Sequence, residues 1–198
     1  MPLSSPAKRQ PIHTRQIECR GYRRADGLWD IEGQLTDTKA YAFKNDYRGT
    51  VEPGEALHGM WLRLTVDDGL TIVAVEAVTD DGPYPICGAI TPAFQQLVGL
   101  SIRPGFSRKV KELLGGVRGC THLVELIGPV ATTAFQTIFP ILSRERAAGS
   151  HGSDEPCDEA TPGKRRPPLL NSCHAFASNS EIVKRYWPDF YTGDRAAE

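Results

Sequence analysis

Two cysteines, Cys87 and Cys120, stand at positions where a thiol could do chemistry. Each lies where an extended or glycine-rich segment is expected to give way to a helix. The first turn of a helix carries unsatisfied N–H groups and the positive end of the helix dipole, so a thiol held there is biased toward the thiolate. Because the thiolate binds metal ions and attacks electrophiles, both cysteines are candidate ligands or nucleophiles.

Histidines add imidazole donors to these thiols. His122 follows Cys120 by two residues, a Cys173–His174 pair lies near the C-terminus, and His58 precedes a predicted strand. For His58, a solvated loop position is the alternative. No pair has the C-x-x-C spacing of a strong zinc motif. The sequence predicts a metal site for zinc or an iron–sulfur cluster, with donors drawn from Cys87, Cys120, His122, His58, Cys173 and His174.

The remaining cysteines are expected to lie outside this site. Cys19 falls in a predicted strand, where a free thiol usually packs as a small apolar side chain. Cys157 and the neighbouring His151 fall in a polar, low-complexity stretch with nothing to hold them in a ligand geometry. Five cysteines are an odd count, which favours reduced thiols over a disulfide framework.

Length and composition limit the class of protein. The 198 residues, of which 40% are hydrophobic, fit one domain with tails better than two domains. A net charge of −1 gives no support for binding nucleic acid or an acidic membrane surface. No apolar run suggests a signal peptide or a membrane span, so we expect a cytoplasmic protein.

The N-terminal half has the pattern of an antiparallel sheet. After an arm over residues 1–13 that is expected to be disordered, residues 15–24 and 28–36 predict a hairpin around Asp26-Gly27. Residues 60–66 alternate apolar and polar side chains, as a strand with one buried face does. Residues 70–78 are apolar on both faces, which predicts a central strand.

The second half changes to helical periodicity. Helices are expected over residues 92–100, 106–114 and about 120–139, with Pro129 kinking or breaking the last one. Residues 143–168 are predicted to form a mobile loop, because they are rich in Gly, Ser, Pro and charge. A C-terminal segment, residues 169–193, has a capping box from Ser178 to Glu181 and is expected to dock on the domain formed by residues 14–142. Strands followed by helices predict an α+β fold of two layers.

Part of this pattern resembles U-type iron–sulfur cluster assembly scaffolds. The run MWLRLTVDDGLTIVAVEAVTDDGPYPICGAI, followed by GCTHL at the start of a long helix, is similar to their core over roughly residues 56–140. In that alignment Cys87 and Cys120 match two of the three cysteine ligands of those scaffolds. The first cysteine falls near Ala56, and His58 stands about where the scaffolds have an aspartate. The resemblance therefore implies a site that has lost one thiolate but could still hold metal with mixed Cys and His ligands.

The whole chain is also similar to a bacterial family of unknown function, DUF2889. The motifs that carry this similarity extend over nearly the full length and are His13-Thr14-Arg15, Cys19-Arg20-Gly21-Tyr22, Asp26-Gly27-Leu28-Trp29-Asp30-Ile31-Glu32-Gly33, Gly119-Cys120-Thr121-His122-Leu123 and Cys173-His174-Ala175. Because no activity is assigned to that family, the similarity supports the fold more than the function.

Three function classes follow from these residues. The first is a metal-binding accessory or scaffold-like protein for zinc or an iron–sulfur cluster. The second is an enzyme acting on a small molecule, either through a metal with an open position or through Cys120 as a nucleophile with His122 or His174 as base. The third is a non-catalytic interaction module whose cysteines pack. A small molecule or a client protein is the expected partner, with no nucleic acid and no membrane, and the oligomeric state is left open.

Overall fold

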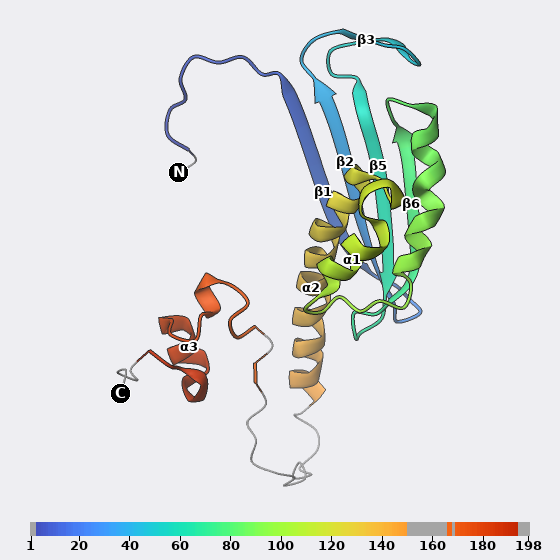
Figure 1. Ribbon diagram of the computed structural model, residues 1–198. Helices are drawn as coiled ribbons and strands as arrows, with labels where there is room; N and C mark the ends of the chain where they lie inside the picture. The colour runs from blue at the N-terminus through green and yellow to red at the C-terminus, as the bar shows by residue number, and fades with distance from the viewer. Residues whose placement is uncertain (1–2, 150–165, 168, 194–198) are drawn as a thin grey trace. The chain divides into compact units, whose positions relative to one another are not determined.

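The computed structural model describes residues 3–149, 166–167 and 169–193. The chain divides into two compact units, residues 1–151 and residues 152–198, and each is described by itself. The first unit combines an antiparallel sheet, built from the N-terminal half, with the helices that follow it (Figure 1). The predicted α+β class is therefore confirmed.

Four antiparallel strands form the sheet, in the order β1 (His13–Arg23), β2 (Trp29–Lys39), β5 (Ala56–Val66) and β6 (Ile72–Asp81). The predicted hairpin of β1 and β2 turns at Asp26 and Gly27, and Gly27 has the positive φ of 87° that such a turn requires. A separate two-stranded hairpin, β3 (Phe43–Asn45) with β4 (Gly49–Val51), occupies the connection between β2 and β5.

One face of this sheet, which we call the inner face, forms the core. On β2 the side chains of Trp29, Ile31 and Leu35 are fully buried, because successive side chains of a strand point to opposite faces. On β5 the inner face is formed by Met60, Leu62, Leu64 and Val66. Both alternations agree with the pattern predicted from the sequence.

Strand β6 lies at an edge of the sheet, so its predicted central position is wrong. Its second apolar face is partly open, with Val73 41% exposed and Val78 37% exposed. The segment after β6 folds back against it, and the Gln95 side-chain amide donates a hydrogen bond to the Val75 carbonyl at 2.7 Å. Phe94 and Leu97 of this segment belong to the core, whereas the second apolar face of β6 stays partly open to solvent.

The segment after β6 is the 3-10 helix η1 (Pro85–Leu97), so the helix expected over residues 92–100 is present but its predicted bounds are wrong. Pro92 lies inside it and has no N–H to donate, which disfavours a regular α-helical ladder. Helix α1 (Phe106–Leu114) has the predicted bounds and buries Phe106, Val110 and Leu114. The short 3-10 helix η2 (Gly116–Arg118) connects it to the next helix.

Helix α2 (Thr121–Gly149) lies on the inner face across β1, β2 and β5 (Figure 1). Two inner-face glycines allow the close approach. A Cβ atom at Gly33 would lie 2.5 Å from Val130 Cγ2, and one at Gly21 would lie 2.1 Å from Thr137 Oγ1. Neither distance is possible for a real side chain, so the helix can take this position only over glycine.

Helix α2 is longer than expected. It continues through Pro129 and Pro140 without a break and ends at Gly149. Residues 143–149, which were predicted to begin a mobile loop, are therefore helical. The apolar face that packs on the sheet, together with the Arg23–Glu145 ion pair, extends the helix into this polar stretch. Most of the predicted loop, including His151 and Cys157, lies outside the described residues.

By length and composition alone, residues 121–145 of α2 could cross a membrane, with a mean hydropathy of 1.4. Seven buried side chains of this helix belong to the core of the first unit, namely Leu123, Leu126, Ile127, Val130, Ala131, Ala134 and Ile138. A long helix over about residues 120–139 was predicted from the sequence, but an apolar run long enough to cross a membrane was not. A cytoplasmic location stays a prediction.

The described part of the second unit contains η3 (His174–Phe176), α3 (Glu181–Tyr186) and η4 (Pro188–Phe190). The N-cap of α3 is Ser180, whose Oγ accepts a hydrogen bond from the Val183 N–H at 3.2 Å. The N-cap predicted at Ser178 is therefore wrong. Docking of this segment on the first unit stays a prediction.

Replacing Gly33 by alanine should destabilise the first unit by about 1–3 kcal/mol, because the new methyl group forces α2 away from the sheet. The matched control is Gly88→Ala, since a Cβ atom there meets no atom within 4 Å and its φ is not positive. Urea denaturation of both variants measures the difference in free energy of unfolding. Equal stability of the two variants would contradict the close approach of α2.

Candidate metal centre

Asp37 is a buried carboxylate at the end of β2, only 1% exposed. It continues the inner-face alternation of Ile31, Gly33 and Leu35, so the same period of two that builds the core also turns this side chain inward. A buried charge is costly unless it is paired and hydrogen-bonded. The surroundings of Asp37 therefore have to supply partners.

The first partner is His58, which lies directly opposite Asp37 in the register of β2 with β5. Its Nδ1 is 3.0 Å from Asp37 Oδ2. His58 lies two residues before Met60 and four before Leu62, which both point to the inner face. Because side chains alternate along a strand, the imidazole of His58 points to the inner face as well. The side chain is 13% exposed, so it is mostly buried.

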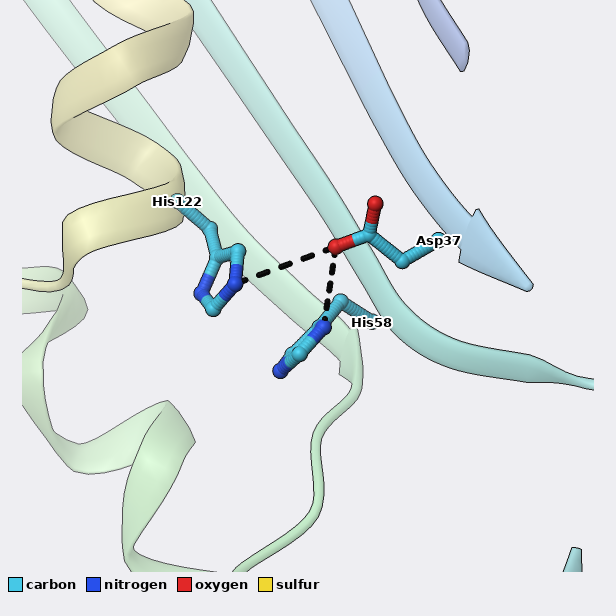
Figure 2. A group of neighbouring side chains, drawn as sticks. All are labelled: Asp37, His58 and His122. Atoms are coloured by element: carbon cyan, nitrogen blue, oxygen red, sulfur yellow. Dashed lines mark hydrogen bonds and ion pairs between the residues drawn. The ribbon is translucent and has the colours of Figure 1, made fainter. Parts of the chain in front are cut away.

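The second imidazole comes from the other layer. His122 lies in the first turn of α2, and its Nε2 is 3.8 Å from the same carboxylate oxygen, Asp37 Oδ2 (Figure 2). The rings of His58 and His122 stack, with 3.7 Å between their centroids and 29° between their planes. Asp37 Oδ2 thus faces a nitrogen of His122, which comes from the helix, and a nitrogen of His58, which comes from the sheet.

On the other side of Asp37, strand β1 supplies a cation. Arg15 is the register partner of Asp37 and binds it with two hydrogen bonds, Nε to Oδ1 at 2.8 Å and Nη2 to Oδ2 at 2.7 Å. The third guanidinium nitrogen, Nη1, is bound by Glu125 of α2. His13 adds a contact of 3.3 Å from Nε2 to Asp37 Oδ1. Both carboxylate oxygens are thereby held in a fixed orientation.

These contacts keep Asp37 ionised. Burial by itself raises the pKa of the carboxyl group, but the hydrogen bond and charge of Arg15 and the hydrogen bond from His58 outweigh it and lower the pKa to about 2. The Arg15 guanidinium responds in the opposite direction, since its hydrogen bond with Asp37 raises its pKa. At neutral pH the carboxylate is charged and acts only as an acceptor.

The two imidazoles are kept neutral. Burial lowers the pKa of His58, and the nearby His122 lowers it further, against the opposing effect of Asp37. Burial also lowers the pKa of His122, helped by the positive charge of Arg15. Neutral imidazole is the form that binds metal ions through its nitrogen lone pair.

One ligand atom from each of Asp37, His58 and His122 lies within 4.8 Å of the others, and these three residues could hold a metal ion. Zinc bonds of about 2.0–2.2 Å in tetrahedral geometry place donors roughly 3.3–3.6 Å apart. The distances from Asp37 Oδ2, 3.0 Å to His58 and 3.8 Å to His122, lie on either side of that spacing. Small side-chain shifts would therefore bring all three donors to bonding distance.

The structure places the other predicted donors differently. Cys120 lies immediately before α2, and its Sγ is 3.8 Å from Nδ1 of His122, the ring nitrogen other than the one that faces Asp37. Cys87 lies in η1, packed beside Gly82. Cys173 and His174 belong to the second unit. Of the six predicted donors, the group with Asp37 contains His58 and His122.

Asp37 and Arg15 were not among the site residues predicted from the sequence. The strand was expected to end at Thr36, whereas β2 continues to Lys39. A signal was present in the sequence, because Asp37 falls on the alternation of Ile31 and Leu35 that marks the buried face. An acidic residue in phase with a buried apolar face is a candidate for a site.

The sequence profile of a family described as "Protein of unknown function (DUF2889)" matches residues 13–136. The matched segment contains β1 through most of α2 and includes Arg15, Asp37, His58 and His122. No curated protein and no solved structure matches the chain. The resemblance to iron–sulfur scaffolds has no support from these comparisons.

The low pKa of Asp37 makes the stability of the first unit depend on pH in the acid range. Above about pH 4 the carboxyl group is ionised in both the folded and the unfolded chain, and its full contribution to the free energy of unfolding is present. As pH falls from about 4 to about 2, the unfolded chain takes up the proton first, and on the order of 2 kcal/mol is lost.

Urea denaturation of the wild type and of Asp37→Asn between pH 7 and pH 2 measures this loss. The stability difference between the two proteins should narrow as the pH falls below 4. Asp46→Asn, which removes an exposed aspartate in the β3–β4 turn, serves as the control and should follow the wild-type curve. A gap between the wild type and Asp37→Asn that stays constant with pH would contradict the pairing of Asp37.

Proposed function

Since this chain belongs to the DUF2889 family of proteins of unknown function, its role has to be inferred from its own site, and we propose that it binds one divalent transition-metal ion, such as zinc, through Asp37, His58 and His122. The observation that supports the proposal is the convergence of one ionised carboxylate and two neutral imidazoles at the end of the inner face. Two histidines and one carboxylate are a common donor set for catalytic zinc and for iron(II).

The charges around the site favour a cation. Arg15 carries one positive charge, which Glu125 balances, so the ionised Asp37 leaves the cluster with one net negative charge. Each oxygen of a carboxylate has two lone-pair sites, so the hydrogen bond from Arg15 Nη2 leaves Oδ2 able to bind a metal. Arg15 would then act from outside the ligand set and orient the carboxylate.

The donor set also distinguishes between metals. Iron–sulfur clusters are held mainly by cysteine thiolates, whereas the three donors that lie together are oxygen and nitrogen. Cys120 contacts the nitrogen of His122 that does not face Asp37, and by accepting the Nδ1–H hydrogen bond it would leave Nε2 free to bind the metal. A divalent ion therefore fits these residues better than a cluster does.

Three protein ligands leave a coordination position for water or a small molecule. Structural zinc sites usually have four protein ligands, and catalytic sites usually have three. The partial exposure of His58 and His122, 13% and 23%, would allow a small molecule to reach the ion. The site thus favours a metal-dependent enzyme or a protein that carries and releases a metal, and we propose a cytoplasmic location for either role.

A second candidate function uses the thiol. Cys120, His122 and Asp37 form a relay in which the sulfur contacts one ring nitrogen and the carboxylate lies 3.8 Å from the other. In this arrangement His122 would act as the general base for a Cys120 nucleophile, and Asp37 would orient the ring. The two candidates differ in the role of Cys120, which is essential for the thiol chemistry and dispensable for metal binding.

Isothermal titration of the metal-free full chain with zinc should show one site. Asp37→Asn, His58→Gln and His122→Gln should each weaken binding by at least about 100-fold, because each removes one donor. The matched control is His174→Gln, a histidine of the second unit, which should bind zinc as the wild type does. Cys87→Ser and Cys120→Ser should also retain binding.

Cobalt(II) gives an independent reading of the ligands. Titration with cobalt should produce visible absorption of a nitrogen- and oxygen-bound ion without a sulfur-to-cobalt charge-transfer band. Loss of zinc binding in Cys87→Ser and Cys120→Ser, together with a charge-transfer band, would instead support a thiolate site. Binding that none of the three donor substitutions changes would refute the proposal.

A further inference from the structure

Strand β1 leaves one edge of the sheet open. Ten of its eleven residues are exposed, and only Cys19 is partly buried. In the described part of the chain, the backbone hydrogen bonds of β1 go to β2 alone. The strand contains no proline, and its register with β2 has no bulge. Prolines, bulges and charged side chains protect sheet edges, because a long unpaired edge is a template for another strand. Of these three features β1 has only the charges, which are Arg15, Glu18, Arg20 and Arg23.

The opposite edge of the sheet is protected. The segment after η1 returns along β6, where the Ile72 N–H donates to the Leu100 carbonyl at 2.9 Å and the Gly99 N–H donates to the Ile72 carbonyl at 2.8 Å. The Gln95 side chain occupies a further carbonyl, that of Val75. The fold thus covers one edge with its own chain and presents the other, as Figure 1 shows for the first unit.

We propose that β1 pairs with β1 of a second copy of this chain, in antiparallel orientation and centred on Cys19, so that the two four-stranded sheets form one continuous sheet. In this register Glu18 lies opposite Arg20 of the partner subunit, and the twofold axis repeats the pair. Opposite residues of an antiparallel pair have Cβ atoms about 4.5–5.5 Å apart, so these charges interact directly. A twofold interface requires such self-complementarity.

The charges of β1 select this register over its neighbours. Centring the pair on Glu18 would place two glutamates opposite each other, and centring it on Arg20 would do the same with two arginines, which is unfavourable. Glu18 and Arg20 already contact each other within one chain at 2.6 Å, on the outer face of the sheet. Pairing across the edge joins this contact to its symmetry copy, so that the four charges alternate around a square.

The other opposed side chains are compatible with the register. Ile17, 40% exposed, lies opposite Gly21 of the partner subunit, and Tyr22, 43% exposed, lies opposite Gln16 of the partner subunit. Two apolar side chains are thereby covered. Arg15 lies opposite Arg23 of the partner subunit, but each is already bound to carboxylates of its own chain, Arg15 to Asp37 and Glu125 and Arg23 to Glu145.

Charge reversal tests the register directly. The wild-type full chain should have twice the monomer mass of 21.7 kDa in light scattering coupled to size exclusion. Glu18→Arg and Arg20→Glu should each be monomeric, because like charges then face each other twice. An equimolar mixture of the two variants should dimerise again, since every Arg and Glu at these positions then has an opposite charge across the edge.

The control is Glu112→Arg, which reverses a charge in an exposed ion pair of α1 with Arg108 and should leave the dimer intact. Hydrogen exchange of the wild type provides a test without substitutions, because the β1 amides that point away from β2 should lose protection when the dimer is diluted. A wild type that is monomeric at every concentration, or single variants that still dimerise, would overturn the proposal. So would β1 amides whose exchange does not depend on concentration.

Discussion

The packing of α2 directly on the inner face of the sheet is the constraint on which the rest of the first unit depends. The helix can approach because Gly21 and Gly33 present no side chain to Thr137 and Val130. This contact buries the apolar face of the helix and sets the position of its first turn along the strands. Since His122 is in that first turn, the same contact that forms the core also brings an imidazole to Asp37.

A buried carboxylate then organises the end of the sheet. Asp37 is in phase with the core residues of β2, so it is turned into the protein where water cannot solvate it. The sheet register compensates the buried charge by placing Arg15 of β1 on one side of Asp37 and His58 of β5 on the other. Strand pairing therefore produces a row of cation, carboxylate and imidazole across three strands. Helix α2 adds His122 to this row from the other layer.

This arrangement admits a purely structural interpretation, in which Arg15 and the histidines only compensate a buried charge. The Arg15 guanidinium already compensates the charge of Asp37 with two hydrogen bonds. The two neutral imidazoles of His58 and His122 are therefore not needed to compensate this charge. Polar groups are expensive to bury, so an excess of donors around one oxygen favours a ligand that uses them. The low pKa of the carboxyl group and the lowered pKa values of both histidines keep all three residues in the forms that bind metal.

The sequence by itself determined the class of fold and most of the strands. Alternation along β2 and β5, the Asp26-Gly27 turn and the helical spacing of α1 depend on nearest neighbours and on the period of each element, which a sequence displays directly. It also identified His58 and His122 as donors. Tertiary structure alone decided that these two lie together with Asp37, because strand register and the position of α2 bring together residues far apart in the chain. Cys87 and Cys120 are not part of the group formed by Asp37, His58 and His122. Their position at a predicted helix start indicates where a thiol is reactive, but it does not indicate which residues lie beside that thiol.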